Sequence, residues 1–353
     1  MRVLPSRNCY RSQVDMKKNR LVLFTIGFLF MNMISPLSAR AESVSSCKTK
    51  ECYWGYLQKY NANHSPQEVI DNFEKISKLT NGMNGNCNDL GRKIGSDLYN
   101  KLGNKVFVYF SVECGHSIGY GMFESYGKKN KIIDEKLLTN YCLKDSNTPS
   151  CTFGFGLAIG KYDMKKAYLS CEKNFYGYDK DKKAPDSFQM SARGDCFNGF
   201  ISSYVNSKPP MNSVKEIEVE CKKVPPLYAA ICSGIFDYNY LSNSPKSLVV
   251  ISKKLQEIRG ECTSKSGYEC MQFVGKNTDQ ALTYKLEIHP RDAKSLKIYS
   301  DLINKICQGY NARACITGVI QSHIVHTSHA EMRSICSLLK EKTYCLKTTK
   351  EHV

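Results

Sequence analysis

Apolar side chains recur at helical spacing in several segments of the chain. The clearest segment opens with Ser65-Pro66-Gln67-Glu68, where serine can cap a helix, proline suits its first turn and glutamate can reach back to the cap. Such stripes predict amphipathic helices that pack through one face. Three stripes are Val69, Ile70, Phe73, Ile76 and Leu79; Leu248, Val249, Ile251, Leu255 and Ile258; and Leu296, Ile298, Leu302, Ile303 and Ile306.

One apolar segment has no helical period. Residues 106–112 read Val-Phe-Val-Tyr-Phe-Ser-Val, which is typical of a buried strand and equally of a buried helix. Periodicity cannot decide between the two for so short a run.

The first long apolar run, Leu21–Leu37, has the surroundings of a secretory signal peptide. Three of residues 17–20 are basic, and Ala39-Arg40-Ala41 supplies the small residues that signal peptidase needs. We therefore expect residues 1–41 to be a signal peptide, with Met16 as an alternative start. The run is near the lower length limit for a bilayer span, so a membrane anchor is the alternative. Bacterial export to the periplasm or the outside is predicted, with no stable membrane span in the mature chain.

The chain is basic, with a formal net charge of +17. Residues 1–41 hold seven of the 50 basic and one of the 33 acidic residues, so the mature part keeps a charge of +11. A basic surface favours a protein or an anionic envelope component as partner, and an exported chain is not expected to bind nucleic acid. The scattered lysines are equally typical of a solvated surface.

Sixteen cysteines follow residue 41, an even number that indicates a disulfide framework in an exported protein. Intervals of eight to eleven residues recur, and we expect pairing within them. The pairs so predicted are Cys142 with Cys151, Cys221 with Cys232, Cys262 with Cys270, Cys307 with Cys315, and Cys336 with Cys345. Sequential pairing would further join Cys47 with Cys52, Cys87 with Cys114, and Cys171 with Cys196. Metal binding is the alternative, although no Cys-x-x-Cys pair is present to hold zinc.

The segments inside these intervals resemble helix–helix turns. Asp145–Ser150, Thr263–Gly267 and Gln308–Asn311 are rich in residues that favour turns. A cysteine that ends one helix can then meet a cysteine that opens the next. Several of the second cysteines begin a Cys-x-x-Gly pattern, and a glycine one turn into a helix lets a neighbouring helix approach closely.

The cysteine spacing also suggests a repeat. Cys221 and Cys262 are 41 residues apart, and Cys262 and Cys307 are 45 apart, periods typical of stacked helical hairpins. We therefore predict an all-α array of disulfide-stapled hairpins. It would comprise a helical cysteine-rich region at 42–206 and hairpin repeats at 207–353, with a break near Ser207-Lys208-Pro209-Pro210.

Cys87-Asn88-Asp89-Leu90-Gly91, and the segment from Gly160 through Asp163–Ala167 to Cys171, resemble pieces of SEL-like repeats. The eight-residue cysteine intervals resemble those of the cysteine-rich, secreted branch of that family. The resemblance covers about a third of the mature chain and implies tetratricopeptide-like helix pairs that serve protein binding. The family's Gly-x-Gly loop is missing before Asp163.

Two patterns could carry chemistry. Gly115-His116-Ser117-Ile118-Gly119 fits the nucleophile elbow of α/β-hydrolases, with Ser117 as nucleophile and His289 or His323 as base. The alternative is a helix start with glycines that allow close packing.

The second pattern is His323, His326 and His329, whose spacing could bind a transition metal near Glu331 or could be a solvated helix face. No cofactor motif is present.

Aromatic residues gather in two places, either to line a binding groove or to pack between hairpins. They are Phe175, Tyr176 and Tyr178, and Phe236, Tyr238 and Tyr240. Packing is favoured, because large aromatic side chains are mostly buried. We conclude that the chain is an exported interaction module, an inhibitor, immunity or virulence-type factor without a cofactor. A secreted serine hydrolase using Ser117 is the alternative.

Overall fold

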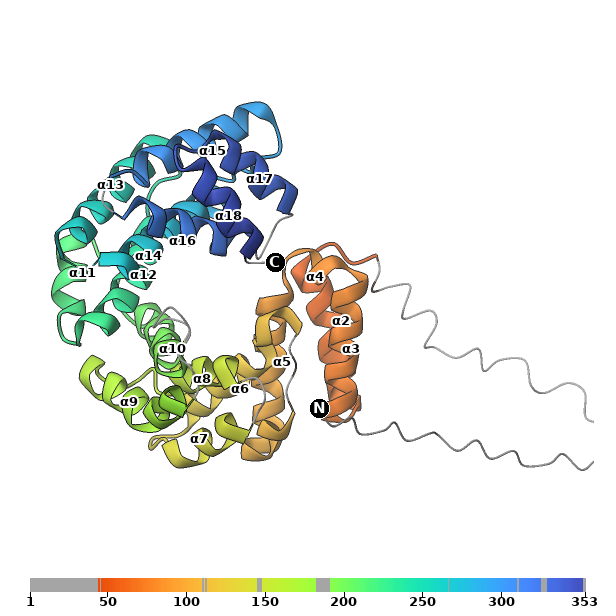
Figure 1. The fold of residues 1–353 in the computed structure, drawn as a ribbon. Coiled ribbons are helices and arrows are strands. Elements are labelled where there is room, and N and C mark those ends of the chain that lie inside the picture. The colour runs from red at the N-terminus through yellow and green to blue at the C-terminus, as the bar shows by residue number, and fades with distance from the viewer. Residues whose placement is uncertain are drawn as a thin grey trace, which may run out of the picture. The chain divides into compact units, whose positions relative to one another are not determined.

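Every regular element in the described part of the chain is a helix. The computed structural model describes residues 44, 46–109, 111, 113–144, 148–181, 191–265, 267–309, 311–324 and 329–351, so the predicted signal peptide lies outside it. The helices, labelled in Figure 1, are α2 (Lys50–Asn63), α3 (Pro66–Leu79), α4 (Asn81–Asn84), α5 (Cys87–Leu102), η1 (Gly103–Val108), α6 (Glu113–Lys129), α7 (Glu135–Lys144), α8 (Thr148–Ala158), α9 (Met164–Asp181), α10 (Ala192–Asn206), α11 (Val214–Cys221), α12 (Pro226–Ser242), α13 (Leu248–Lys265), α14 (Gly267–Gln280), η3 (Ala281–Lys285), α15 (Ala293–Ile306), α16 (Ala312–Ile324), α17 (His329–Leu338) and α18 (Lys342–Glu351). None of these is both long and apolar enough to cross a bilayer.

The start of α3 shows how local sequence sets a helix boundary. The Ser65 hydroxyl accepts a hydrogen bond from the backbone N–H of Glu68 at 3.4 Å, and the Glu68 carboxylate accepts one from the backbone N–H of Ser65 at 2.8 Å. Pro66 is the first helical residue. The predicted capping box is therefore confirmed, and it satisfies two donors that the helix itself leaves without partners.

The predicted apolar stripes are buried in their middles and exposed at some ends. The side chains of Leu79, Leu248 and Val249 are 73%, 37% and 79% exposed, so their assignment to the core is wrong. Leu79 is the last residue of α3, and Leu248 and Val249 are the first two of α13. Terminal residues have fewer neighbours to cover them, which a periodic pattern cannot express.

The apolar run at 106–112 forms a short 3₁₀ helix, η1, in its first part. Val106 and Phe107 are buried, whereas Val108 is exposed. The Phe107 ring packs 4.9 Å from that of Phe123 and 5.9 Å from that of Tyr126, both on α6. Phe110 and Val112 lie outside the described residues.

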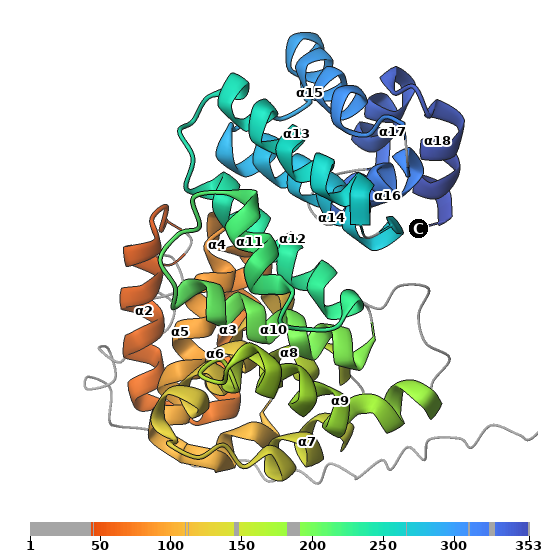
Figure 2. The ribbon, with the colours of Figure 1, turned by 90° about the vertical axis from the view of Figure 1, so that its left-hand side faces the viewer.

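Successive antiparallel hairpins make up the fold. The hairpins pair α7 with α8, α9 with α10, α11 with α12, α13 with α14, and α17 with α18. The even-numbered helices from α6 to α18 pack on one another in chain order (Figures 1 and 2). Residues 207–210 lie in the loop between α10 and α11, and α10 packs on α12 across this loop. The boundary at residue 207 stays a prediction.

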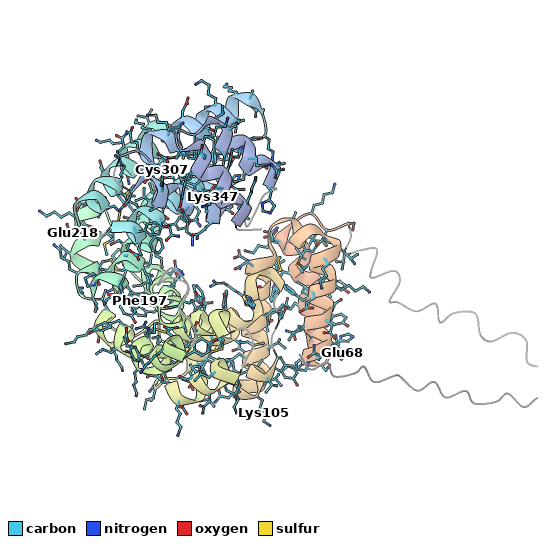
Figure 3. All side chains as sticks on the ribbon, in the orientation of Figure 1. Glu68, Lys105, Phe197, Glu218, Cys307 and Lys347 are labelled. Carbon is cyan, nitrogen blue, oxygen red and sulfur yellow. A yellow bond between two sulfur atoms is a disulfide. The ribbon has the colours of Figure 1, made fainter. Side chains whose placement is uncertain are left out.

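Disulfides join the cysteines in sequential order. Six of the eight join consecutive helices, and in five of these six the first cysteine lies at or near the end of its helix, whereas Cys171 lies in the middle of α9. Cys307, between α15 and α16, is labelled in Figure 3. Cys87 and Cys114 join the starts of α5 and α6, and Cys47 and Cys52 close a small loop before and within α2. The six hairpin pairs are Cys142–Cys151, Cys171–Cys196, Cys221–Cys232, Cys262–Cys270, Cys307–Cys315 and Cys336–Cys345.

Glycines set the closest helix crossings. A Cβ on Gly275 of α14 would overlap with the carbonyl oxygen of Cys315 on α16, and one on Gly318 of α16 would overlap with that of Gln272 on α14. The same reciprocal arrangement joins Gly95 with Gly121 and Gly156 with Gly199. The glycine of the Cys-x-x-Gly pattern thus has the packing role predicted from the sequence, since only a residue without a side chain allows two backbones to touch.

Candidate functional site

A cavity of about 410 Å³ lies between the α11–α12 hairpin and the α13–α14 hairpin. Most of its lining is apolar: Val214, Ile217, Val224, Ala229, Ala230 and Ile258. A water molecule occupies about 30 Å³ of liquid, so the cavity has room for a side chain or a small ligand.

Disulfides hold the walls of this cavity in place. Cys221 at the end of α11 is bonded to Cys232 of α12, and Cys262 of α13 is bonded to Cys270 of α14. Three of these four cysteines line the cavity. A cavity whose two hairpins are each covalently closed is pre-formed, which lowers the ordering cost of binding.

One carboxyl group lies deep in the cavity. The side chain of Asp237, on α12, is only 5% exposed and lines the cavity wall. Its Oδ1 atom has no hydrogen-bond partner among the described residues. Burial raises the pKa of Asp237 well above the ordinary value for an aspartate, and the nearby charge of Glu261 raises this pKa further.

Two other buried aspartates among the described residues have hydrogen-bond partners. Asp179 accepts from the backbone N–H of Ala192 at 2.7 Å and from the guanidinium of Arg193 at 2.7 Å. Asp279 accepts from the Tyr299 hydroxyl and lies 2.8 Å from His323 Nδ1. Buried polar groups nearly always have partners, so Asp237 is an exception that calls for an explanation.

The remaining polar groups of the cavity carry mostly negative charge. Glu218, labelled in Figure 3, forms a salt bridge of 3.0 Å with Lys222, so the only basic side chain that lines the cavity among the described residues is already paired. Glu261 and Asp237 add two further carboxyl groups, and Ser233 adds a hydroxyl. The site therefore combines an apolar wall with an excess of acid groups.

The sequence contained a signal for this site that the prediction missed. Asp237 is the only charged residue of α12, a 17-residue helix, and it stands between the aromatic residues Phe236 and Tyr238. Phe236 is buried and Tyr238 is 38% exposed, so the predicted aromatic cluster flanks the cavity residue without forming a groove of its own. A lone acid in an otherwise uncharged helix is expensive to bury and thus indicates a function.

Ser117 lies in the interface between α5 and α6. Its side chain is fully buried, and a Cβ on Gly91 would overlap with its hydroxyl oxygen. This oxygen has no hydrogen-bond partner among the described residues, so no histidine is in position to activate it. A nucleophile elbow needs a strand before its serine, and η1 is a 3₁₀ helix in that position. His289 is exposed, on the segment after η3.

Of the three histidines in the predicted metal cluster, the structure describes His323 and His329. His323 is buried in α16, with Nδ1 2.8 Å from Asp279 and 3.0 Å from the hydroxyl of Tyr299. Its Nε2 atom lies 3.9 Å from the Glu331 carboxylate on α17. His329 begins α17, whereas His326 lies outside the described residues. Within the described ranges no group of three His, Cys, Asp or Glu side chains is arranged to hold a metal ion.

The buried His323 has a structural consequence. Asp279, Tyr299 and His323 belong to α14, α15 and α16, so their hydrogen bonds tie three consecutive helices together in the core. Burial and the neighbouring Asp279 raise the pKa of Tyr299 well above its usual range, which keeps its hydroxyl protonated as a donor.

Comparison of the chain with protein-family models, with curated proteins and with solved structures found no match.

Proposed function

We propose that the chain is an exported interaction module that binds a partner protein through the cavity between α11 and α14. The observation that carries this proposal is the buried carboxyl group of Asp237 in a pre-formed apolar cavity, with its Oδ1 atom lacking a hydrogen-bond partner among the described residues. Eight disulfides indicate an oxidising compartment outside the cytoplasm, in agreement with the signal peptide expected at residues 1–41. The partial resemblance to secreted SEL-like repeats supports protein binding as the general role.

Capture of the native partner by a cavity-blocked variant tests this proposal. Ala229 lines the cavity and is only half-buried, so Ala229→Trp should fill the cavity without crowding the core. Ala330→Trp, on the exposed face of α17, is the matched control. We expect wild type and Ala330→Trp to retain the same protein from envelope and extracellular material, and Ala229→Trp to lose it at an unchanged melting temperature. Equal retention by a folded Ala229→Trp variant would refute the cavity as the binding site.

The alternative function, a serine hydrolase using Ser117, makes an opposite prediction. Because the Ser117 hydroxyl is buried without a base, we expect no labelling by a fluorophosphonate probe. We also expect Ser117→Ala to leave the free energy of unfolding unchanged or to raise it slightly, since the substitution removes a buried hydroxyl without a partner. Probe labelling of wild type that disappears in Ser117→Ala would establish the hydrolase instead.

A further inference from the structure

Resting on the proposed cavity, we infer that the group it receives from the partner is a lysine side chain, with its methylenes on the apolar wall and its ammonium on Asp237. A lysine side chain has the two features that fit this site: an apolar stem, and a compact cation with three hydrogen-bond donors. Asp237 offers an acceptor that is 95% buried and that nothing in the described chain fills.

The charged groups that line the cavity favour a cationic ligand over other polar ligands. Glu261 lines the same cavity as Asp237, and the basic Lys222 is already bonded to Glu218. An anionic ligand would therefore meet the negative charge of Glu261 in a low-dielectric site, whereas an ammonium ion would be attracted to Glu261 and would stabilise the ionised form of Asp237. A neutral alcohol gains only the apolar contact and one hydrogen bond.

The surroundings favour a polypeptide over a free amine as the source of this cation. Val219 on α11 and Leu227 on α12 are 59% and 50% exposed. Each is the next residue in sequence to one that lines the cavity, Glu218 and Pro226. Exposed apolar side chains beside a cavity are typical of protein contact surfaces, where they would meet the residues that flank the inserted lysine.

Proton release gives the inference a specific signature. The empty cavity holds Asp237 in its neutral form, because burial raises the pKa of this carboxyl. An incoming ammonium ion stabilises the carboxylate, so the Asp237 proton leaves to solvent as the ion pair forms. Affinity for an amine should then rise as the pH rises toward the raised pKa of Asp237, whereas affinity for an alcohol should not. The other titratable groups that line the cavity are Glu218, Lys222 and Glu261, and Tyr240 of α12 also interacts electrostatically with Asp237.

Calorimetric titration of the full mature chain with three six-carbon probes tests the charge assignment. We expect n-hexylamine to bind about 10- to 100-fold more tightly than 1-hexanol at pH 8, and hexanoate to bind most weakly. The amine should release close to one proton, measured in buffers of different ionisation enthalpy. Asp237→Asn, nearly identical in shape, should abolish both the preference and the proton release, whereas the control Ala330→Trp should keep them.

The outcomes separate the inference from the proposed function. Equal binding of all three probes, with binding lost in Ala229→Trp, would leave the cavity as a binding site and refute the cation. Binding of none of them would refute the lysine inference, whereas the proposed function is decided separately by the capture experiment with Ala229→Trp. N-acetyl-lysine methylamide tests the source: it should bind at least as tightly as n-butylamine, and its Nε-acetylated form should not bind. If n-butylamine binds but the capped lysine does not, the lysine assignment is wrong and a free amine is the ligand.

Discussion

Reduction of the eight disulfides is expected to unfold the protein at room temperature. Each bridge contributes about 2–4 kcal/mol, mainly by restricting the unfolded chain, and together they exceed the about 5–15 kcal/mol that a folded domain typically has in reserve. Treatment with dithiothreitol should therefore collapse the helical circular-dichroism signal. The reduced protein should react with about sixteen thiol equivalents, and the untreated protein with none of the sixteen cysteines after residue 41.

Individual bridges should differ in their effect on the free energy of unfolding. Cys171 and Cys196 are 25 residues apart, fully buried and link α9 to α10. Cys47 and Cys52 are five residues apart in a local loop. Loop entropy alone predicts a larger loss for the first pair by roughly 1–1.5 kcal/mol, and burial of two serines adds to this loss. A denaturant titration of the two double-serine variants measures the difference. Equal midpoints, or a reduced wild type that stays helical, would contradict the view that the disulfides hold the hairpins closed.

Replacement of Gly275 by alanine should lower the free energy of unfolding strongly for a single added methyl group. Its Cβ would overlap with the backbone oxygen of Cys315, and a backbone atom cannot turn aside as a flexible side chain can. The α14–α16 crossing must therefore widen, at an expected cost of about 1–3 kcal/mol or more. Gly318→Ala acts at the same crossing, so the double variant should cost less than the two single changes together. Urea unfolding followed by circular dichroism gives these values.

Gly260→Ala is the matched control for this crossing. Gly260 lies within α13, and a Cβ there would meet no atom within 4 Å. Because glycine is a poor helix former, this variant should gain up to about 1 kcal/mol. A loss of stability in Gly260→Ala as large as that in Gly275→Ala would show that the backbone contact at Gly275 does not set the effect.

The sequence motifs did not predict the surroundings of Ser117 and His323, because these surroundings depend on contacts between distant segments. Ser117 fits a catalytic motif locally, yet its hydroxyl is covered by Gly91, which lies 26 residues earlier in the chain. His323 fits a surface metal cluster locally, yet Asp279 and Tyr299 bring it into the core. A one-dimensional motif records spacing along one segment, whereas burial is decided by the helices that pack over it.

The sequence by itself determined the covalent and periodic features of this protein. Short cysteine intervals favour local pairing, the capping box at Ser65 and Glu68 acts within four residues, and apolar periodicity reports which face of a helix is covered. Only the tertiary structure decided that Asp237 lies in an apolar cavity where its Oδ1 atom has no hydrogen-bond partner among the described residues, because the cavity walls come from four helices between residues 214 and 280. Local chemistry fixes hairpins, but a binding cavity exists only where separate hairpins leave space between them.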